Sequence, residues 1–179
     1  MEVAGRAEWL RRCVHIAVGI PAWIVTRETA MTWAYACFAG AFFNTLLLSR
    51  VPVVGDVTRV VRGTRGTILY PLVIGVLLVL FRERPQLACV GWLALALGDG
   101  STPFFARVRS CAWPTNPKKK LIPSLLGGLV AGAGASFVID AKIAFPACLV
   151  AALADAIPWC DDNVSWPVLA ATVAWGMST

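Results

Sequence analysis

Long apolar runs separated by short charged segments are the feature that most constrains the fold of this chain. Of its 179 residues, 58% are hydrophobic and 15% are charged, and the mean hydropathy is +0.71. Soluble domains average about 45–50% apolar and about 25% charged residues. Apolar runs of this kind are typical of membrane-spanning helices of about 20 residues. The sequence therefore predicts an all-α, polytopic integral membrane helix bundle, with residues 1–179 in a single domain.

Seven apolar segments are candidate spans. If the N-terminus is cytoplasmic and every segment crosses, 12 of the 16 Lys and Arg residues lie inside, and this asymmetry supports seven spans. The prediction is a multi-pass protein with its charged loops at the cytoplasmic face, in the plasma membrane if prokaryotic or the endoplasmic reticulum if eukaryotic. The segments are Trp9–Val25, Ala30–Leu48, Ile68–Phe81, Leu87–Leu97, Leu121–Ile139, Ile143–Ile157 and Val164–Met177.

The formal net charge of +6 raises the question of a nucleic-acid partner. The basic residues cluster at the ends of apolar segments, where the positive-inside bias and anionic lipid headgroups explain them. We therefore expect membrane lipids, and no nucleic acid, as partners. The six cysteines show no Cys-x-x-Cys spacing and are interpreted as small buried hydrophobic residues.

Asp99 lies between Gly98 and Gly100 at the end of an apolar segment. A carboxylate there is unfavourable in lipid, and flanking glycines let a backbone or a phosphate approach closely. A metal ligand and a solvated helix C-terminal turn are about equally good interpretations. Gly128 and Gly132 form a Gly-x-x-x-Gly pattern that indicates close helix packing.

A second acidic group stands just before the last apolar segment. Asp161, Asp162 and Asn163 supply hard oxygen donors of the type that Mg²⁺ accepts, and Asp155 adds a carboxylate a little earlier. The alternative is an N-cap, since Asp and Asn favour helix starts. One residue satisfies a cap, so the second Asp favours the metal interpretation.

Basic residues could supply an anion site. The run Lys118, Lys119 and Lys120, with Ser124 in the helix that follows, is a candidate triphosphate site, although a topology anchor is the better interpretation of the run alone. Arg62 is a candidate for a second anion-binding loop. His15 is a candidate catalytic base, with a hydrogen-bonded interface residue as the more common role for a lone histidine.

Together these groups match the needs of phosphoryl transfer, where positioning and charge neutralisation do most of the work. The order of the pieces resembles the CTP-dependent polyprenol kinase family, which includes dolichol kinase, phytol kinase and the CTP-dependent diacylglycerol kinase. The pieces are Arg12-Cys13-Val14-His15, Arg62 with Gly66-Thr67-Ile68-Leu69-Tyr70-Pro71, Gly98-Asp99-Gly100, Lys118-Lys119-Lys120 with Ser124, and Asp155-Ala156-Ile157-Pro158 with Asp161-Asp162-Asn163.

The resemblance implies a lipid-alcohol kinase that moves the γ-phosphate of CTP, with Mg²⁺, onto an isoprenoid alcohol of the dolichol, polyprenol or phytol type. The predicted catalytic residues are Asp99, Asp162 and His15. The nucleotide-binding residues are Gly98, Gly100, Lys118, Lys119, Lys120, Ser124 and Arg62, and the metal ligands are Asp99, Asp155, Asp161, Asp162 and Asn163.

The chain departs from the family pattern at several positions. Thr102, Ala106 and Ser110 stand where the family favours Ala and then spaced Gly. Ile122 and Pro123 replace an expected Glu and Gly after the lysine run, and Asp155 stands where a Glu is expected. The alternatives to an isoprenoid-alcohol kinase are a CTP-dependent diacylglycerol kinase, a cytidylyltransferase, and a non-catalytic transporter or scaffold whose charged loops only set topology.

Overall fold

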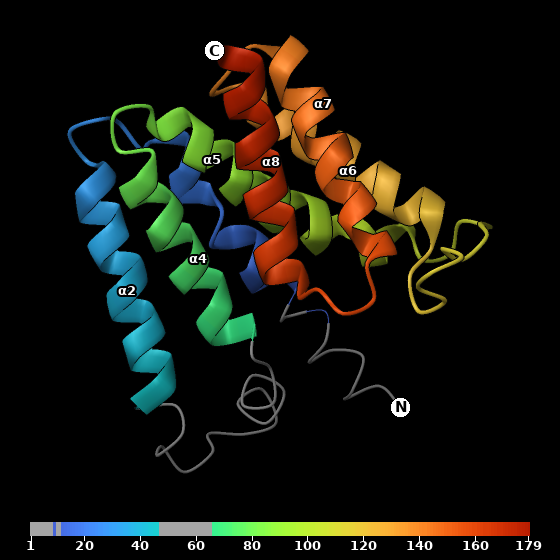
Figure 1. The fold of residues 1–179 in the computed structure, drawn as a ribbon. Coiled ribbons are helices and arrows are strands. Elements are labelled where there is room, and N and C mark those ends of the chain that lie inside the picture. Colours follow the sequence, from blue (N-terminus) through green and yellow to red (C-terminus); the bar gives the residue numbers. More distant parts are fainter. Residues whose placement is uncertain (1–8, 10–11, 47–65) are drawn as a thin grey trace.

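The computed structural model describes residues 9, 12–46 and 66–179, and these parts consist of helices joined by loops (Figure 1). The all-α prediction is confirmed for them. In this set η1, η3 and η4 are 3₁₀-helices and η2 is a π-helix. The elements are η1 (Ile20–Trp23), α2 (Ala30–Leu46), α4 (Gly66–Leu80), α5 (Pro85–Leu93), η2 (Ala94–Asp99), η3 (Thr102–Phe105), α6 (Leu121–Ala135), α7 (Ala141–Ala152), η4 (Leu153–Ala156) and α8 (Asp162–Ser178).

The predicted seven-span integral membrane bundle is wrong. In the described parts of the chain, no helix combines the length and the apolar character needed to cross a membrane. The multi-pass localisation with cytoplasmic loops rested on those spans and is corrected by the same finding.

Two of the predicted spans are broken within their apolar runs. Residues 12–17 are helical, a turn follows, and η1 then begins beside Pro21, so the segment predicted over Trp9–Val25 is divided. The segment predicted over Leu87–Leu97 starts in α5 and ends in the π-helix η2. Hydropathy alone does not locate such changes of helix type, because it depends on composition and not on the backbone hydrogen-bond pattern.

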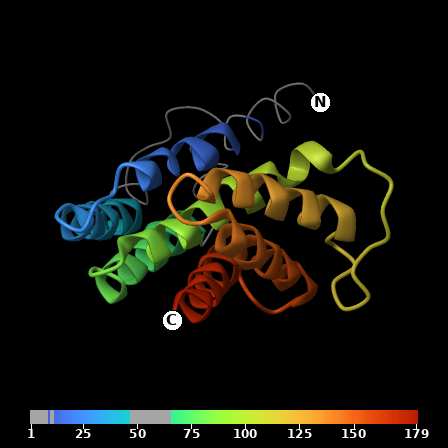
Figure 2. The same cartoon turned by 90° about the horizontal axis from the view of Figure 1, so that it is seen from above.

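Helix α5 is the centre of the fold. Every residue of α5 except Gln86 is buried, as expected for a helix that is apolar on all sides. It contacts α4 on one side and α6, α7 and α8 on the other. Figures 1 and 2 show α2 beside α4, and α6, α7 and α8 packed together across α5.

Small residues and one proline set the helix spacing. A Cβ on Gly132 would lie 2.7 Å from Phe145 Cδ1, and one on Gly128 would lie 3.1 Å from the Cys148 carbonyl oxygen. The predicted close packing through these two glycines is therefore confirmed, with α7 as the partner. Pro71 inside α4 has no N–H for the Thr67 carbonyl, and Asn44 Nδ2 of α2 donates to that oxygen at 2.7 Å.

The ends of four elements bring the polar residues together. Asp99 is the last residue of η2, and Lys119 lies two residues before α6 begins. Asp155 lies in η4, and Asp162 is the first residue of α8. Helix ends leave backbone groups without helical partners and tolerate charged side chains, so this end of the bundle can hold a polar cluster beside an apolar core.

Candidate functional site

A tight loop before α6 presents Lys119. The backbone N–H of Trp113 donates to the Lys119 carbonyl at 3.1 Å, and that of Leu121 donates to the Cys111 carbonyl at 3.1 Å. Ala112 and Lys120 form an isolated antiparallel bridge between these bonds. The chain thus closes on itself at Lys119 and on both sides of Lys120, which restricts the positions open to the Lys119 side chain.

Two side chains attach this loop to η4. Asn116 Nδ2 donates to the Asp155 carbonyl at 2.9 Å, and the Thr115 hydroxyl donates to the Ala156 carbonyl. The loop that carries Lys119 is therefore joined to the segment that carries Asp155 by backbone-directed bonds. These bonds do not depend on the charges of the site.

The Lys119 ammonium lies among three carboxylates, here called the carboxylate cluster: Asp99, Asp155 and Asp162. Its Nζ is 2.7 Å from Asp162 Oδ2, 3.2 Å from Asp155 Oδ1 and 3.6 Å from Asp99 Oδ1. The side chain of Lys119 is 25% exposed. Four groups from three separate parts of the sequence thus meet at one point, with one positive and three negative formal charges.

Asp155 is the buried member of the carboxylate cluster, with only 1% of the residue exposed. Oδ1 accepts from Trp166 Nε1 at 3.1 Å as well as from Lys119. Oδ2 lies 2.5 Å from the hydroxyl of buried Ser124. Both carboxylate oxygens are therefore engaged by protein donors, which is the requirement for burying such a group.

The pKa values of Lys119 and Asp162 are both raised, but for different reasons. Burial alone would lower the pKa of Lys119, but the negative charges of Asp99, Asp155 and Asp162 outweigh it and raise that pKa above its usual value. Burial raises the pKa of Asp162 to about 6, and Lys119 only partly offsets the rise. Near neutral pH, Lys119 is therefore charged, and Asp162 is a carboxylate that takes up a proton readily.

Asp161 and Asn163 lie outside the group that Lys119 contacts. Asp161 is the N-cap of α8, because its Oδ1 accepts from the Asn163 backbone N–H at 3.0 Å. The Asn163 side-chain Nδ2 donates to the same oxygen at 2.8 Å. The cap interpretation therefore describes Asp161, while its neighbour Asp162 reaches the Lys119 ammonium.

His15 approaches the carboxylate cluster from the N-terminal segment. Its Nε2 is 3.2 Å from the Leu95 carbonyl oxygen and 3.9 Å from Asp99 Oδ2. A carbonyl can only accept, so Nε2 carries a proton. Leu95 belongs to the π-helix η2, and short π-helical turns are frequent at functional sites.

The glycines around Asp99 serve packing. A Cβ on Gly98 would lie 2.2 Å from Trp166 Cζ3, and one on Gly100 would lie 3.1 Å from His15 Cδ2. Their predicted role in nucleotide binding remains a prediction. These contacts show that η2 lies close to Trp166 and His15. In this position Asp99 Oδ1 is 3.6 Å from Lys119 Nζ.

The predicted triphosphate residues have different surroundings. Lys118 is exposed, and Lys120 is exposed with its Nζ bonded to the Ala106 carbonyl at 2.9 Å. Ser124 is buried against Asp155 and so has a supporting position. Arg62 lies outside the described residues.

The residues of the predicted magnesium site have a cationic neighbour in this structure. Carboxylate oxygens suit Mg²⁺, but the point at which Asp99, Asp155 and Asp162 converge is held by the Lys119 ammonium. Within the described residues, no three or more His, Cys, Asp or Glu side chains are arranged to hold a metal ion. In this arrangement Lys119 offsets part of the carboxylate charge, and the five metal ligands remain a prediction.

Sequence reasoning missed four supporting residues: Trp166, Asn116, Thr115 and Leu95. Trp166 is one of eight tryptophans, and Leu95 contributes only its carbonyl. The signal that could have found Asn116 and Thr115 is their place in a polar loop just before the lysine run, where short side chains commonly bond to backbone groups.

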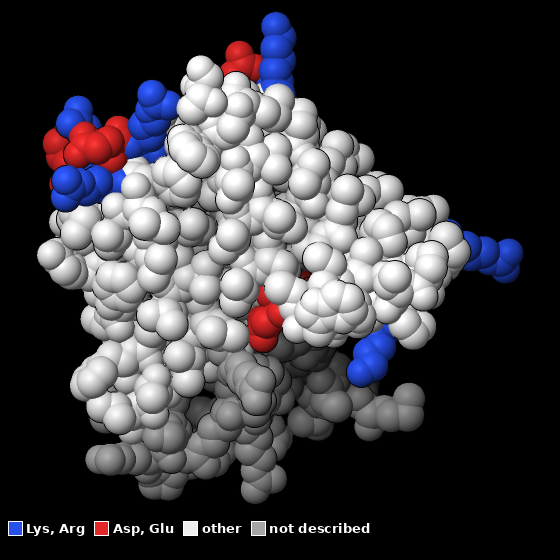
Figure 3. All heavy atoms as spheres, in the orientation of Figure 1, with Lys and Arg blue, Asp and Glu red and all other residues white. Residues whose placement is uncertain are grey.

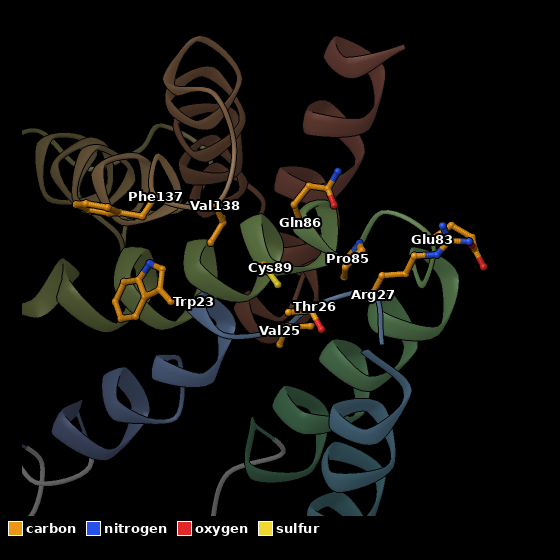
Figure 4. A pocket seen from close by; sticks show the side chains of 10 residues that line it. All are labelled: Trp23, Val25, Thr26, Arg27, Glu83, Pro85, Gln86, Cys89, Phe137 and Val138. Atoms are coloured by element: carbon orange, nitrogen blue, oxygen red, sulfur yellow. The ribbon is translucent and has the colours of Figure 1, made fainter. Parts of the chain in front are cut away.

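A separate pocket of about 330 Å³ lies near the beginning of α5. Figure 4 shows Trp23, Phe137 and Val138 on one side and Arg27 with Glu83 on the other. Arg27 and Glu83 form an ion pair, and both are largely exposed. Phe137 and Val138 of the pocket come just after the C-terminal end of α6, whereas Lys119 comes just before the N-terminal end of that helix. The pocket is therefore separate from the carboxylate cluster.

Comparisons with protein-family models, with curated proteins and with solved structures found no match for this chain.

Proposed function

We propose that this chain is a lipid-alcohol kinase that transfers the γ-phosphate of CTP to the hydroxyl of an isoprenoid alcohol. The observation that carries the proposal is the Lys119 ammonium among Asp99, Asp155 and Asp162 at the ends of four elements. Phosphoryl transfer needs a cation for the phosphate oxygens and a carboxylate for the attacking hydroxyl. This arrangement offers both within a few ångströms.

Asp162 is the proposed general base. A catalytic base works best when its pKa lies near the working pH, and burial raises the pKa of Asp162 to about 6. In the proposed step the alcohol oxygen forms a bond to the γ-phosphorus, the bond from that phosphorus to the bridging oxygen breaks, and CDP leaves. The hydroxyl proton passes to Asp162. Asp99 shares the Lys119 contact and is proposed to orient the alcohol.

Lys119 is the proposed phosphate ligand, and Asp155 is proposed to position it. The buried Asp155 carboxylate is fixed by Trp166 and Ser124, so it holds the ammonium in one place. The three carboxylates of the cluster outnumber the single Lys119 ammonium, so their formal charges sum to a negative value, and a nucleotide is also an anion. Lys118 and Lys120 are exposed on the same loop and are proposed to bind the triphosphate, which arrives with its own divalent cation as part of the substrate.

The apolar surface supports a long-chain substrate. On the face seen in Figure 3 the charged side chains lie at the margins, apart from a small acidic group, and other residues cover the surface between. Large apolar side chains are exposed on helices and beside the site, including Phe42, Leu80, Phe104 and Trp159. Extensive exposed apolar area marks an interaction surface, and we propose that it contacts the hydrocarbon tail of the alcohol and neighbouring lipid.

The test is transfer of label from γ-labelled CTP, with Mg²⁺, to phytol, farnesol, polyprenol, dolichol or diacylglycerol in detergent or lipid. We expect label in one isoprenoid alcohol and release of CDP. Label only in diacylglycerol would select the CTP-dependent diacylglycerol kinase, and pyrophosphate release would select a cytidylyltransferase. A folded protein that binds no CTP and labels no lipid would select the non-catalytic transporter or scaffold.

Variants of Lys119 and Asp162 test whether these residues take part in the transfer. Lys119→Met and Asp162→Asn are expected to abolish transfer. Lys142→Met and Asp140→Asn are the matched controls, because Lys142 and Asp140 are exposed near the opposite end of α6. Asn is as good as Asp at an N-cap, so Asp140→Asn keeps the start of α7. Equal activity in Lys119→Met and Lys142→Met would remove the cluster from the mechanism.

A further inference from the structure

The loop between η3 and α6 carries positive charge that no acidic residue balances. Between Asp99 and Asp140 the sequence has five Lys or Arg residues and no Asp or Glu. The Lys119 ammonium contacts the carboxylate cluster, and the other four cations are exposed. Figures 1 and 2 both show this loop extending beyond the helices. The four exposed cations are Arg107, Arg109, Lys118 and Lys120.

Hydrogen bonds hold the two basic parts of this loop together. Lys120 Nζ donates to the Ala106 carbonyl at 2.9 Å, and the Ile122 backbone N–H donates to the Ser110 hydroxyl oxygen at 2.9 Å. Both arginines lie between Ala106 and Ser110 in the sequence, so they are next to the lysine run. We call residues 104–122 the basic loop. Figure 3 shows Lys and Arg side chains projecting at the margin that this loop occupies in Figure 1.

The basic loop also exposes large apolar side chains. Phe104 is 51% exposed, Val108 is 38% exposed and Ile122 is 39% exposed. A nucleotide or a nucleic-acid backbone is bound by cations and gives no role to exposed aliphatic side chains. An anionic lipid surface uses both kinds of residue, because cations attract the headgroups and apolar side chains enter the acyl-chain boundary.

We propose that the basic loop docks on an anionic lipid surface, with Arg107 and Arg109 at the headgroups and Val108 at the acyl-chain boundary. Lys119 belongs to the same loop, so docking brings the carboxylate cluster close to the lipid. The docking goes beyond the proposed kinase function and does not depend on it. The two arginines are not among the residues proposed to bind CTP, so their variants test docking alone.

A second Arg-x-Arg pair provides a matched control. Arg82 and Arg84 are exposed and have the same spacing as Arg107 and Arg109, but Glu83 stands between them. The Glu83 carboxylate is 3.4 Å from Arg82 Nε. A carboxylate at this position offsets the guanidinium charge and repels anionic headgroups. The pair in the basic loop has a valine in its place.

The measurement is flotation of the purified full chain, without nucleotide or alcohol, with vesicles of phosphatidylcholine alone or mixed with phosphatidylglycerol. Each cation near an anionic lipid surface strengthens binding about fivefold. Arg107→Gln with Arg109→Gln is therefore expected to weaken binding to the mixed vesicles about 25-fold and to leave binding to phosphatidylcholine unchanged. Val108→Ser is expected to weaken binding to both kinds of vesicle. Arg82→Gln with Arg84→Gln is expected to change binding less than about twofold.

The proposal is overturned if the two double variants bind the mixed vesicles equally, since net charge alone then explains the binding. It is also overturned if wild type shows no preference for phosphatidylglycerol, or if DNA or RNA displaces it from the mixed vesicles. Equal thermal unfolding midpoints of wild type and both double variants are the folding control.

The flotation measurement needs no catalysis, so its failure is distinct from failure of the proposed function. A chain without kinase activity that binds the mixed vesicles through Arg107 and Arg109 loses only the proposed function. An active kinase whose two double variants bind these vesicles equally loses only the docking surface.

Discussion

Replacing Lys119 by methionine removes the ammonium that lies within 4 Å of three carboxylates. Asp155 is the carboxylate most affected, because its side chain is fully buried and its Oδ1 is 3.2 Å from Nζ. Removing one partner of a buried ion pair costs about 3–5 kcal/mol, since the remaining charge is uncompensated. Trp166 and Ser124 still donate to Asp155. We therefore expect a loss near the lower end, about 3 kcal/mol of unfolding free energy.

The assay is denaturant unfolding of Lys119→Met in mild detergent, followed by tryptophan fluorescence. Lys142→Met is the control, and a surface substitution of that kind stays within about 0.5 kcal/mol of wild type. In Lys119→Met with Asp155→Asn the buried charge is gone, so the losses do not add, and we expect a coupling energy of about 1–3 kcal/mol. A loss below about 0.5 kcal/mol with additive effects would refute the reasoning that Lys119 holds the carboxylate cluster together.

The remaining predictions address the base, the glycine contact and the cap. The pKa of Asp162 is raised from 3.8 to about 6, so the folded chain binds more protons than the unfolded chain in that window. Stability should fall as pH rises from about 4 to about 6, and Asp162→Asn should remove this change. In wild type, kcat/KM should rise through about pH 6. Gly98→Ala places a Cβ 2.2 Å from Trp166 Cζ3 and should cost about 1–3 kcal/mol in thermal unfolding, whereas an unchanged midpoint would contradict that contact. Asp161→Ala should cost about 1 kcal/mol and Asp161→Asn much less, with transfer activity retained in both; lost activity in the folded Asn variant would make Asp161 more than a cap.

The helical content could be predicted from the sequence, and the lengths of the helices could not. The apolar runs identify α2, α4, α6, α7 and α8, because helices need apolar residues for the core. The same runs do not show where a helix changes type, as α5 does on entering the π-helix η2. The prediction of spans therefore failed at points decided by backbone hydrogen bonds, such as the turn between the helix of residues 12–17 and η1.

Within the site, the charged residues could be predicted and their pairings could not. The sequence predicts Asp99, Asp155, Asp162 and Lys119 as site residues, and the structure brings them together. The sequence gives no reason for Lys119, and not its neighbours, to reach the carboxylates. That choice depends on the loop closed by Trp113 and Leu121, which is a tertiary feature.

Backbone geometry also separates the two neighbouring aspartates. Asp161 and Asp162 are equivalent as residue types, but only the first occupies the N-cap of α8. The cap fixes the Asp161 side chain toward the Asn163 N–H, and the next residue then points to Lys119. A sequence pattern can predict that one of the pair caps the helix, and the structure is needed to tell which.

The most direct test of the proposed site is transfer of label from γ-labelled CTP to an isoprenoid alcohol by wild type, Lys119→Met and Lys142→Met under identical conditions. The account predicts labelled lipid phosphate with wild type and Lys142→Met, and none with folded Lys119→Met. Equal labelling by all three proteins, or no labelling by a folded wild-type chain across the whole alcohol panel, would contradict it.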